Sequence, residues 1–114
     1  MKVYILREPP TEEQVRDMLE VYVTFIKLAV DVERGIAAGG GRYHADCEQA
    51  LLDDGSRQAN LWGADWRPDS RSVEFNAVMN IRPRDGNRSP ELFDRALRAK
   101  VEAIVRRVFE GEER

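Results

Sequence analysis

The chain has 114 residues, of which 42% are hydrophobic and 34% are charged, and its formal net charge at pH 7 is −3. This length suits one domain with a single core, expected over residues 1–114, and the composition is far from that of disordered chains. The net negative charge gives no overall attraction to nucleic acid or to anionic membranes, so neither is an expected partner.

The first third of the chain predicts a strand, a helix and a second strand. The apolar run 3–6 is closed by two prolines and is expected to form the first strand. Thr11, followed three residues later by Gln14, is typical of a helical capping box, and apolar residues at helical spacing follow it up to Tyr22. Over residues 22–34 the apolar residues alternate with a period of two, which predicts the longest strand.

Four glycines follow this predicted strand, and a helix and two further strands are expected after them. Gly35 and the glycines at 39–41 predict a turn or an irregular loop. Apolar spacing predicts a helix over 43–53. Residues 61–66 and 73–81 have strand character, and the short link between them predicts an antiparallel hairpin.

The last predicted helix follows a polar loop over residues 82–89. Ser89 and Pro90 suit an N-cap and a first helical position, although Asp94 could cap a later start. Residues 110–114 are expected to fray. The element order is therefore β-α-β-α-β-β-α, which indicates an α+β domain with a mainly antiparallel sheet and helices packed mostly on one face.

Cysteine usage and the apolar segments bear on the cellular compartment. Cys47 is the only cysteine, so no disulfide can form within the chain, which favours a reducing compartment. The first residues lack the apolar stretch of a signal peptide, and no segment approaches the roughly 20 apolar residues of a membrane span. We therefore expect a cytoplasmic protein with no membrane partner.

The glycine-rich segment leads directly into the start of the helix predicted over 43–53. Backbone N–H groups at Gly40 and Gly41 and the helix dipole favour an anion there, and Arg42 and His44 would add side-chain donors. The spacing matches neither a P-loop nor a dinucleotide-binding pattern. The alternative is that the glycines only turn the chain after a strand.

An arginine-rich loop leads into the last predicted helix. Arg82, Arg84 and Arg88 lie within seven positions, together with Asn87. The planar guanidinium suits phosphate or carboxylate, but it suits the acidic residues of the chain itself equally well. The first function hypothesis is a small binding protein that uses these two loops to capture an anionic ligand bearing phosphate or carboxylate.

Three other polar residues suggest an enzyme as the second hypothesis. Asp31 and Glu33 have the i, i+2 spacing that places both carboxylates on one face of a strand, where they could hold Mg²⁺ or simply face water. His44 is the only histidine and the natural candidate for a catalytic base near neutral pH. Together these residues would form a metal-assisted phosphoester hydrolase. No other cofactor is indicated.

The third hypothesis is a structural or interaction protein that acts as a homodimer. Trp62 and Trp66 share one face of a predicted strand, where they would cover the core or a dimer contact. Phe25 is a further candidate for a surface covered by a second copy. Cys47 lies on an apolar helical stripe and is expected to be buried rather than reactive.

Two long segments of the chain also resemble a known family. Residues 37–66 (AAGGGRYHADCEQALLDDGSRQANLWGADW) and 75–92 (FNAVMNIRPRDGNRSPEL) are similar to segments of an uncharacterised family of small single-domain bacterial proteins of unknown function. The similarity extends over nearly the whole chain. It implies a compact α+β domain of bacterial origin, and it implies neither an activity nor catalytic residues.

Overall fold

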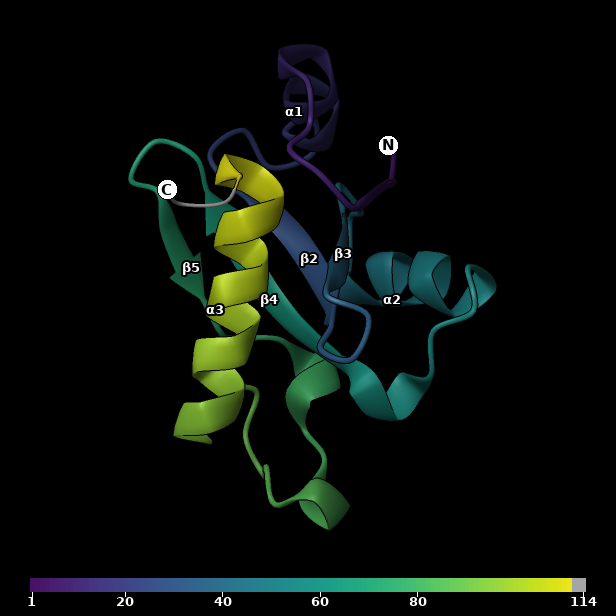
Figure 1. Ribbon diagram of the computed structural model, residues 1–114, viewed down its shortest axis with the longest axis vertical. Coiled ribbons are helices and arrows are strands. Elements are labelled where there is room, and N and C mark those ends of the chain that lie inside the picture. The colour runs from purple at the N-terminus through teal and green to yellow at the C-terminus, as the bar shows by residue number, and fades with distance from the viewer. Residues whose placement is uncertain (112–114) are drawn as a thin grey trace.

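A five-stranded antiparallel sheet forms the centre of the molecule (Figure 1). The structure is a computed structural model that describes residues 1–111. The strands pair in the order β1-β3-β2-β4-β5, and they are β1 (Tyr4–Leu6), β2 (Ile26–Asp31), β3 (Ile36–Gly39), β4 (Leu61–Arg67) and β5 (Ser72–Glu74). The helices are α1 (Glu12–Met18), α2 (His44–Asp53) and α3 (Arg95–Glu110), with short 3₁₀ turns η1 (Gln58–Asn60), η2 (Val78–Asn80) and η3 (Pro83–Asp85). The predicted α+β class is confirmed.

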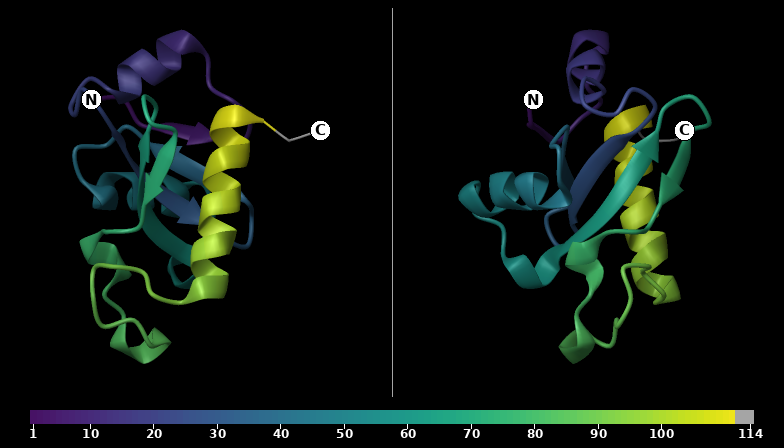
Figure 2. Two further views of the ribbon diagram at one scale, coloured as in Figure 1. Left: turned by 90° about the vertical axis from the view of Figure 1, so that its left-hand side faces the viewer. Right: turned by 180° about the vertical axis from the view of Figure 1, so that it is seen from behind.

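Helices cover both faces of the sheet, as Figures 1 and 2 show. On β2, Leu28 and Val30 point to the face covered by α3, and Ala29 between them points to the face covered by α2. The larger core cluster lies on the α3 face and also includes Met18 at the end of α1. Two of the three helices therefore contribute to one face, and α2 alone covers the other.

The two tryptophans of β4 belong to the core on the α3 face. Trp62 is 5% exposed and Trp66 is 4% exposed. Trp66 stacks on Phe109 of α3, with ring centroids 5.2 Å apart. Their strand face therefore lies inside the molecule. Burial of these large rings contributes strongly to the stability of this layer.

The strand predicted over residues 22–34 is shorter than expected and is followed by an additional strand. β2 ends at Asp31, because the Asp31 Oδ1 atom accepts the backbone N–H groups of Glu33 and Arg34, both at 2.9 Å, and closes a tight turn. The chain then returns as β3, antiparallel to β2, where a loop was predicted. The residues of β3 are mostly alanine and glycine, which have a weak intrinsic preference for strands, and the packing of helices on both faces decides their conformation.

The strand predicted over residues 73–81 was also too long, because β5 ends at Glu74. The chain then leaves the sheet and forms an irregular segment over 75–94, which extends beyond the sheet at the end opposite α1 (Figure 2). The Asn80 side chain fixes this segment to β4, because its Oδ1 accepts the Gly63 N–H at 2.7 Å and its Nδ2 donates to the Gly63 carbonyl at 3.0 Å. Asn80 thus takes the place of a neighbouring strand.

The helices begin and end for identifiable reasons. The predicted capping box of Thr11 and Gln14 is present at α1, but α1 ends at Met18, four residues before Tyr22, with Leu19 as its C-cap. α3 does not begin at Ser89 or Pro90; it begins at Arg95, because the Asp94 side chain accepts the Leu97 N–H at 2.8 Å.

The remaining predictions about helices concern α2, the tail and membrane spans. α2 matches the helix predicted over 43–53 apart from its first residue. The tail was expected to fray over 110–114, but Glu110 still belongs to α3, and residues 112–114 lie outside the described part of the chain. Within residues 1–111, no helix has the length and apolar character needed to cross a membrane.

Candidate functional site

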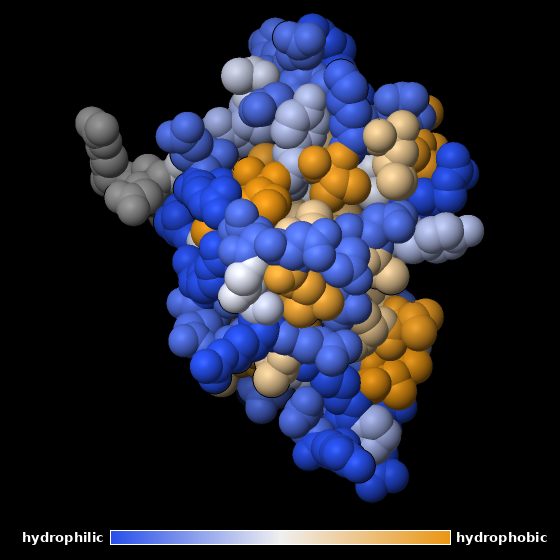
Figure 3. Space-filling view, turned by 90° about the vertical axis from the view of Figure 1, so that its right-hand side faces the viewer, coloured by the Kyte–Doolittle hydropathy of each residue, from blue (hydrophilic) through white to orange (hydrophobic). Residues whose placement is uncertain are grey.

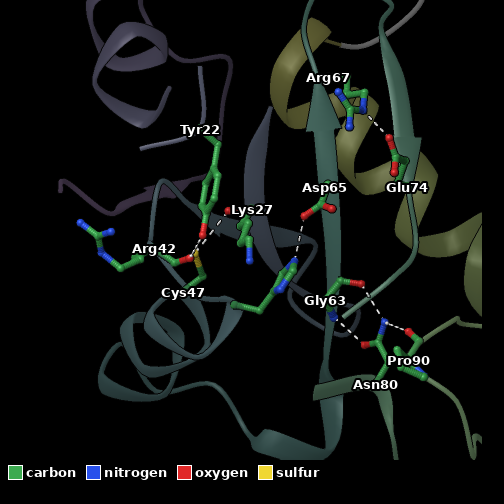
Figure 4. A network of polar contacts seen from close by, with 11 residues as sticks. Tyr22, Lys27, Arg42, Cys47, Gly63, Asp65, Arg67, Glu74, Asn80 and Pro90 are labelled. Atoms are coloured by element: carbon green, nitrogen blue, oxygen red, sulfur yellow. Dashed lines mark hydrogen bonds and ion pairs between the residues drawn. The ribbon is translucent and has the colours of Figure 1, made fainter. Parts of the chain in front are cut away.

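A polar patch occupies the part of the sheet beside the start of α2. Lys27 of β2 and Asp65 of β4 are direct cross-strand partners, and their side chains share the α2 face with Ala29 and Gly63. His44 is the first residue of α2 and reaches over this patch. Its Nε2 atom lies 2.8 Å from Oδ1 of Asp65 (Figure 4). The fold therefore joins residues of β2, β4 and α2 at one place.

The contact with Asp65 fixes the protonation pattern of the neutral imidazole. An ionised carboxylate can only accept hydrogen bonds, so Nε2 of His44 carries the proton and donates it to Asp65. Both side chains are largely buried, with 11% of His44 and 15% of Asp65 exposed. The other ring nitrogen, Nδ1, has no hydrogen-bond partner within residues 1–111 and is not among the buried atoms that lack one. Nδ1 can therefore accept a hydrogen bond or take a proton from a bound molecule.

An open cavity of about 400 Å³ lies next to this imidazole and is called the His44 pocket. Lys27 contributes the only amino group of its lining, and its Nζ atom lies 4.9 Å from the centroid of the Tyr22 ring. No acidic group among residues 1–111 lies within 4.0 Å of this ammonium. The lining residues are Lys27, Tyr43, His44, Ala45, Val78 and Met79.

Cys47 lies beneath the patch and is unreactive in this setting. Its Sγ atom donates to the Lys27 carbonyl at 3.3 Å, and the residue is fully buried. Burial raises the pKa of the Cys47 thiol to about 11, so the thiolate is scarce near neutral pH. The expectation of a buried cysteine is confirmed.

A second open cavity, of about 520 Å³, adjoins the first and is called the Arg82 cavity. Met79 lines both cavities and so forms the wall between them. The lining residues are Glu48, Gln58, Ala59, Met79, Ile81, Arg82 and Asp85.

Arg82 itself is bound mainly to the protein. Its guanidinium carbon lies 4.0 Å from the centroid of the Trp62 ring, and its nitrogens donate to the carbonyls of Met79, Gln58 and Ala59. Its Nη2 atom is buried without a partner in the described structure. Burial lowers the pKa of the Arg82 guanidinium, although it stays a strong base. Arg82 therefore serves first to hold η1 and η2 together.

The glycine-rich loop is packed closely against neighbouring parts of the chain. Gly40 has φ of +102°, and a Cβ there would collide with the Lys2 carbonyl oxygen, so glycine is needed for the close approach of the two chain segments. The start of α2 is already capped, because the Asp46 carboxylate accepts the Tyr43 N–H at 2.9 Å. Gly41 is buried beside this cap, and the side chain of Arg42 extends into solvent.

The arginine-rich loop is organised around a buried asparagine. The Nδ2 atom of Asn87 donates to the carbonyls of Asn80, Ser89 and Glu91, so this side chain shapes the loop from inside. Arg84 and Arg88 are exposed, and neither lines the His44 pocket or the Arg82 cavity. Of the predicted ligand-binding side chains, the structure brings His44 and Arg82 into adjacent cavities and leaves the others apart.

The predicted metal ligands lie at a different part of the sheet. Asp31 is fully buried and is used in the β2–β3 turn, and Glu33 accepts the Asn60 side-chain N–H at 2.6 Å. Asp31 lies four residues along β2 from the position opposite Asp65, which is about 13 Å in a strand. No group of three or more metal-binding side chains occurs in the part of the chain that the structure describes. The structure therefore does not unite Asp31 and Glu33 with His44.

Lys27 and Asp65 were missed by reasoning from the sequence. Each is a charged residue with apolar residues on both sides in its strand, and each faces the same way as a small residue, Ala29 or Gly63. This combination is a usable signal, because a charge between small residues indicates an open part of a sheet face. Their pairing could not be read without the register of β2 on β4.

In the comparison with known protein families, one family model matches nearly all of the chain. A family model, DUF5674, described as a protein of unknown function, matches residues 4–108. The chain belongs to DUF5674. The match runs from β1 almost to the end of α3 and confirms the predicted family resemblance; bacterial origin stays a prediction. No curated protein and no solved structure matches this DUF5674 chain.

Proposed function

We propose that this DUF5674 domain binds a small molecule that bears a carboxylate or phosphate group, and that the acidic group lies in the His44 pocket. One observation carries the proposal: a lysine whose ammonium has no acidic oxygen within 4.0 Å in the described structure and a histidine held by Asp65 line the same cavity. The ammonium of Lys27 would form a charge-assisted hydrogen bond to the anion. His44, when protonated at Nδ1, would donate a second one.

The surroundings of these two groups support a ligand of moderate size. The cavity of about 400 Å³ falls within the range of small-molecule sites. Tyr43 is 61% exposed and Val78 is 77% exposed, so the pocket has an apolar rim that can contact the rest of the ligand.

The other two hypotheses gain no such support. The hydrolase hypothesis needs Asp31 and His44 to act on one substrate, and Asp31 is turned into its own hairpin. The dimer hypothesis started from Trp62 and Trp66, which are both core residues. Phe25 is stacked on Tyr22 at a centroid distance of 4.8 Å, so it has a partner within the chain.

The proposal can be tested by following amide resonances in NMR titrations with acetate and with inorganic phosphate. Shifts should concentrate at Lys27, His44 and Val78. Lys27→Met and His44→Gln should each weaken binding about tenfold, the usual effect of losing one charge-assisted hydrogen bond.

Arg88→Met is the matched control, because it removes an exposed cation outside the pocket and should leave the affinity unchanged. Loss of binding in Arg88→Met with retention in Lys27→Met would place the anion at the arginine-rich loop instead. The absence of saturable shifts with both anions would refute the proposed function.

A further inference from the structure

The His44 pocket and the Arg82 cavity are neighbours and are together called the α2–η2 groove. Met79 lines both, so the two parts of the groove lie on either side of this side chain. His44 and Glu48 are four residues apart on α2 and therefore lie one helical turn apart on the same side of the helix. Each of them lines one of the two cavities. The groove thus runs along α2 for about one turn, or roughly 6 Å.

The two ends of the groove differ in charge. At the His44 end, the Lys27 ammonium is the cation of the lining, and the Asp65 carboxylate beside it is hydrogen-bonded to His44. At the Arg82 end, Glu48 has no ion pair within residues 1–111, and the nearest approach of Asp85 to Arg82 is 3.9 Å. Two carboxylates stand against one guanidinium in this lining, so this end keeps a net negative charge.

The middle of the groove is apolar. Val78, Met79 and Ile81 line its η2 side, and Val78 and Ile81 are 77% and 42% exposed. Exposed aliphatic side chains of this size, gathered between two charged ends, are typical of a surface that contacts a ligand. The space-filling view in Figure 3 shows hydrophobic surface in patches on this side of the molecule, bordered by polar residues.

We infer that the ligand of the α2–η2 groove is an elongated zwitterion, with an acidic group at the Lys27 end, an amino group at the Glu48 end and an aliphatic segment across Met79. The inference rests on the proposed function, because it uses the same acidic subsite. The one-turn separation of His44 and Glu48 corresponds to an ω-amino acid with four to five methylene groups, roughly 6–8 Å between its charged ends. 6-Aminohexanoate is a suitable probe.

Binding of 6-aminohexanoate should be compared with that of hexanoate by NMR titration at constant ionic strength. The amino acid should bind about tenfold more tightly, because its ammonium adds a charge-assisted contact with Glu48. Glu48→Gln should reduce its affinity to that of hexanoate and leave hexanoate binding unchanged. Asp85→Asn should act in the same direction and provides a second variant at an exposed position.

Glu12→Gln, on the exposed surface of α1, is the matched control and should change neither affinity. Equal affinities for hexanoate and 6-aminohexanoate in the wild type, or a folded Glu48→Gln protein that keeps the difference, would overturn the inference and leave the proposed function intact. If neither carboxylate binds the wild type, the proposed function fails as well.

Discussion

At the scale of single residues, the Asn80 side chain makes the two hydrogen bonds to Gly63 that a neighbouring strand would otherwise make. Gly63 lies opposite β2 on one side, but on its other side β5 does not reach it, and there the Asn80 side chain supplies both a donor and an acceptor to the Gly63 backbone. Its Nδ2 also contacts the Pro90 carbonyl at 3.3 Å. A buried N–H or C=O that loses its partner costs about 1–3 kcal/mol. One asparagine therefore holds the η2 side of the candidate site in place.

Asn80→Ala should lower the free energy of unfolding by about 2–4 kcal/mol, because it leaves both Gly63 groups unpaired in the interior. Urea denaturation followed by circular dichroism measures this change. Asn76→Ala is the control: Asn76 is exposed, its side-chain contact is long at 3.4 Å, and the expected change is below about 0.5 kcal/mol. Equal effects of the two substitutions would contradict this role of Asn80.

Prediction from the sequence succeeds at this scale where a residue acts locally. The Thr11–Gln14 capping box and the burial of Cys47 follow from spacing alone, and both are present. The contacts of Asn80 with Gly63 and of His44 with Asp65 join residues 17 and 21 positions apart. Such contacts depend on strand register, which a single sequence does not specify.

At the scale of elements, the junction between β3 and α2 depends on Gly40. Its φ of +102° disfavours any residue with a side chain, and a Cβ would also meet the Lys2 backbone and Met18. The segment looked like a turn because glycine is common in turns, but its glycines serve close packing between a strand and its neighbours. This explains why β3 was mistaken for a loop.

Gly40→Ala should destabilise the protein by about 2–4 kcal/mol, through backbone strain and collision together. Gly55→Ala separates these causes, because Gly55 has φ of +104° and a Cβ added there would meet no atom within 4 Å. It should cost only about 1 kcal/mol. Thermal unfolding of both variants gives the comparison, and similar losses of stability would show that collision at Gly40 contributes nothing.

The C-terminal end of α2 is tied to two strands through Asp54. Its Oδ2 atom lies 2.6 Å from Nη2 of Arg34, in the β2–β3 turn, and 2.6 Å from Nη2 of Arg7, after β1. The hydrogen bond from Arg34, together with the charges of both arginines, lowers the pKa of the Asp54 carboxyl. A lowered folded-state pKa means that this contribution to stability is present above the unfolded-state pKa and is lost as pH falls through the folded-state value.

Asp54→Asn should therefore be less stable than the wild type at neutral pH, and the difference should disappear as the pH is lowered below the pKa of Asp54 in the folded protein. Urea denaturation at a series of pH values from neutral down to strongly acidic measures both curves. Asp53→Asn, whose carboxylate accepts a hydrogen bond from Gln49 of the same helix, should show no comparable trend. A constant difference between Asp54→Asn and wild type at all pH values would contradict the electrostatic explanation.

At the scale of the whole molecule, the fold class and most elements were predictable, but the strand register that brings Lys27 and Asp65 together was not. The period-two pattern of β2 and the helical stripe of α3 indicate which face each element buries, so the sequence predicts both elements. The predicted anion site combined two loops because both are rich in donors. In the structure, the side chains of Asn87 and Arg82 contact other parts of the chain and shape the loop. The side chains of Lys27 and His44 line the pocket.

The proposed function depends most on one arrangement, in which Asp65 holds the single histidine so that Nδ1 faces a ligand in the His44 pocket. Long-range ¹H–¹⁵N correlation of the imidazole tests it directly, because the chain has one histidine and one set of signals. We expect the neutral form of the ring to carry its proton on Nε2, and we expect an Nδ1 resonance that moves toward the protonated value when acetate is added. A proton on Nδ1 in the free protein, or an Nδ1 resonance unmoved at saturating acetate, would contradict this arrangement.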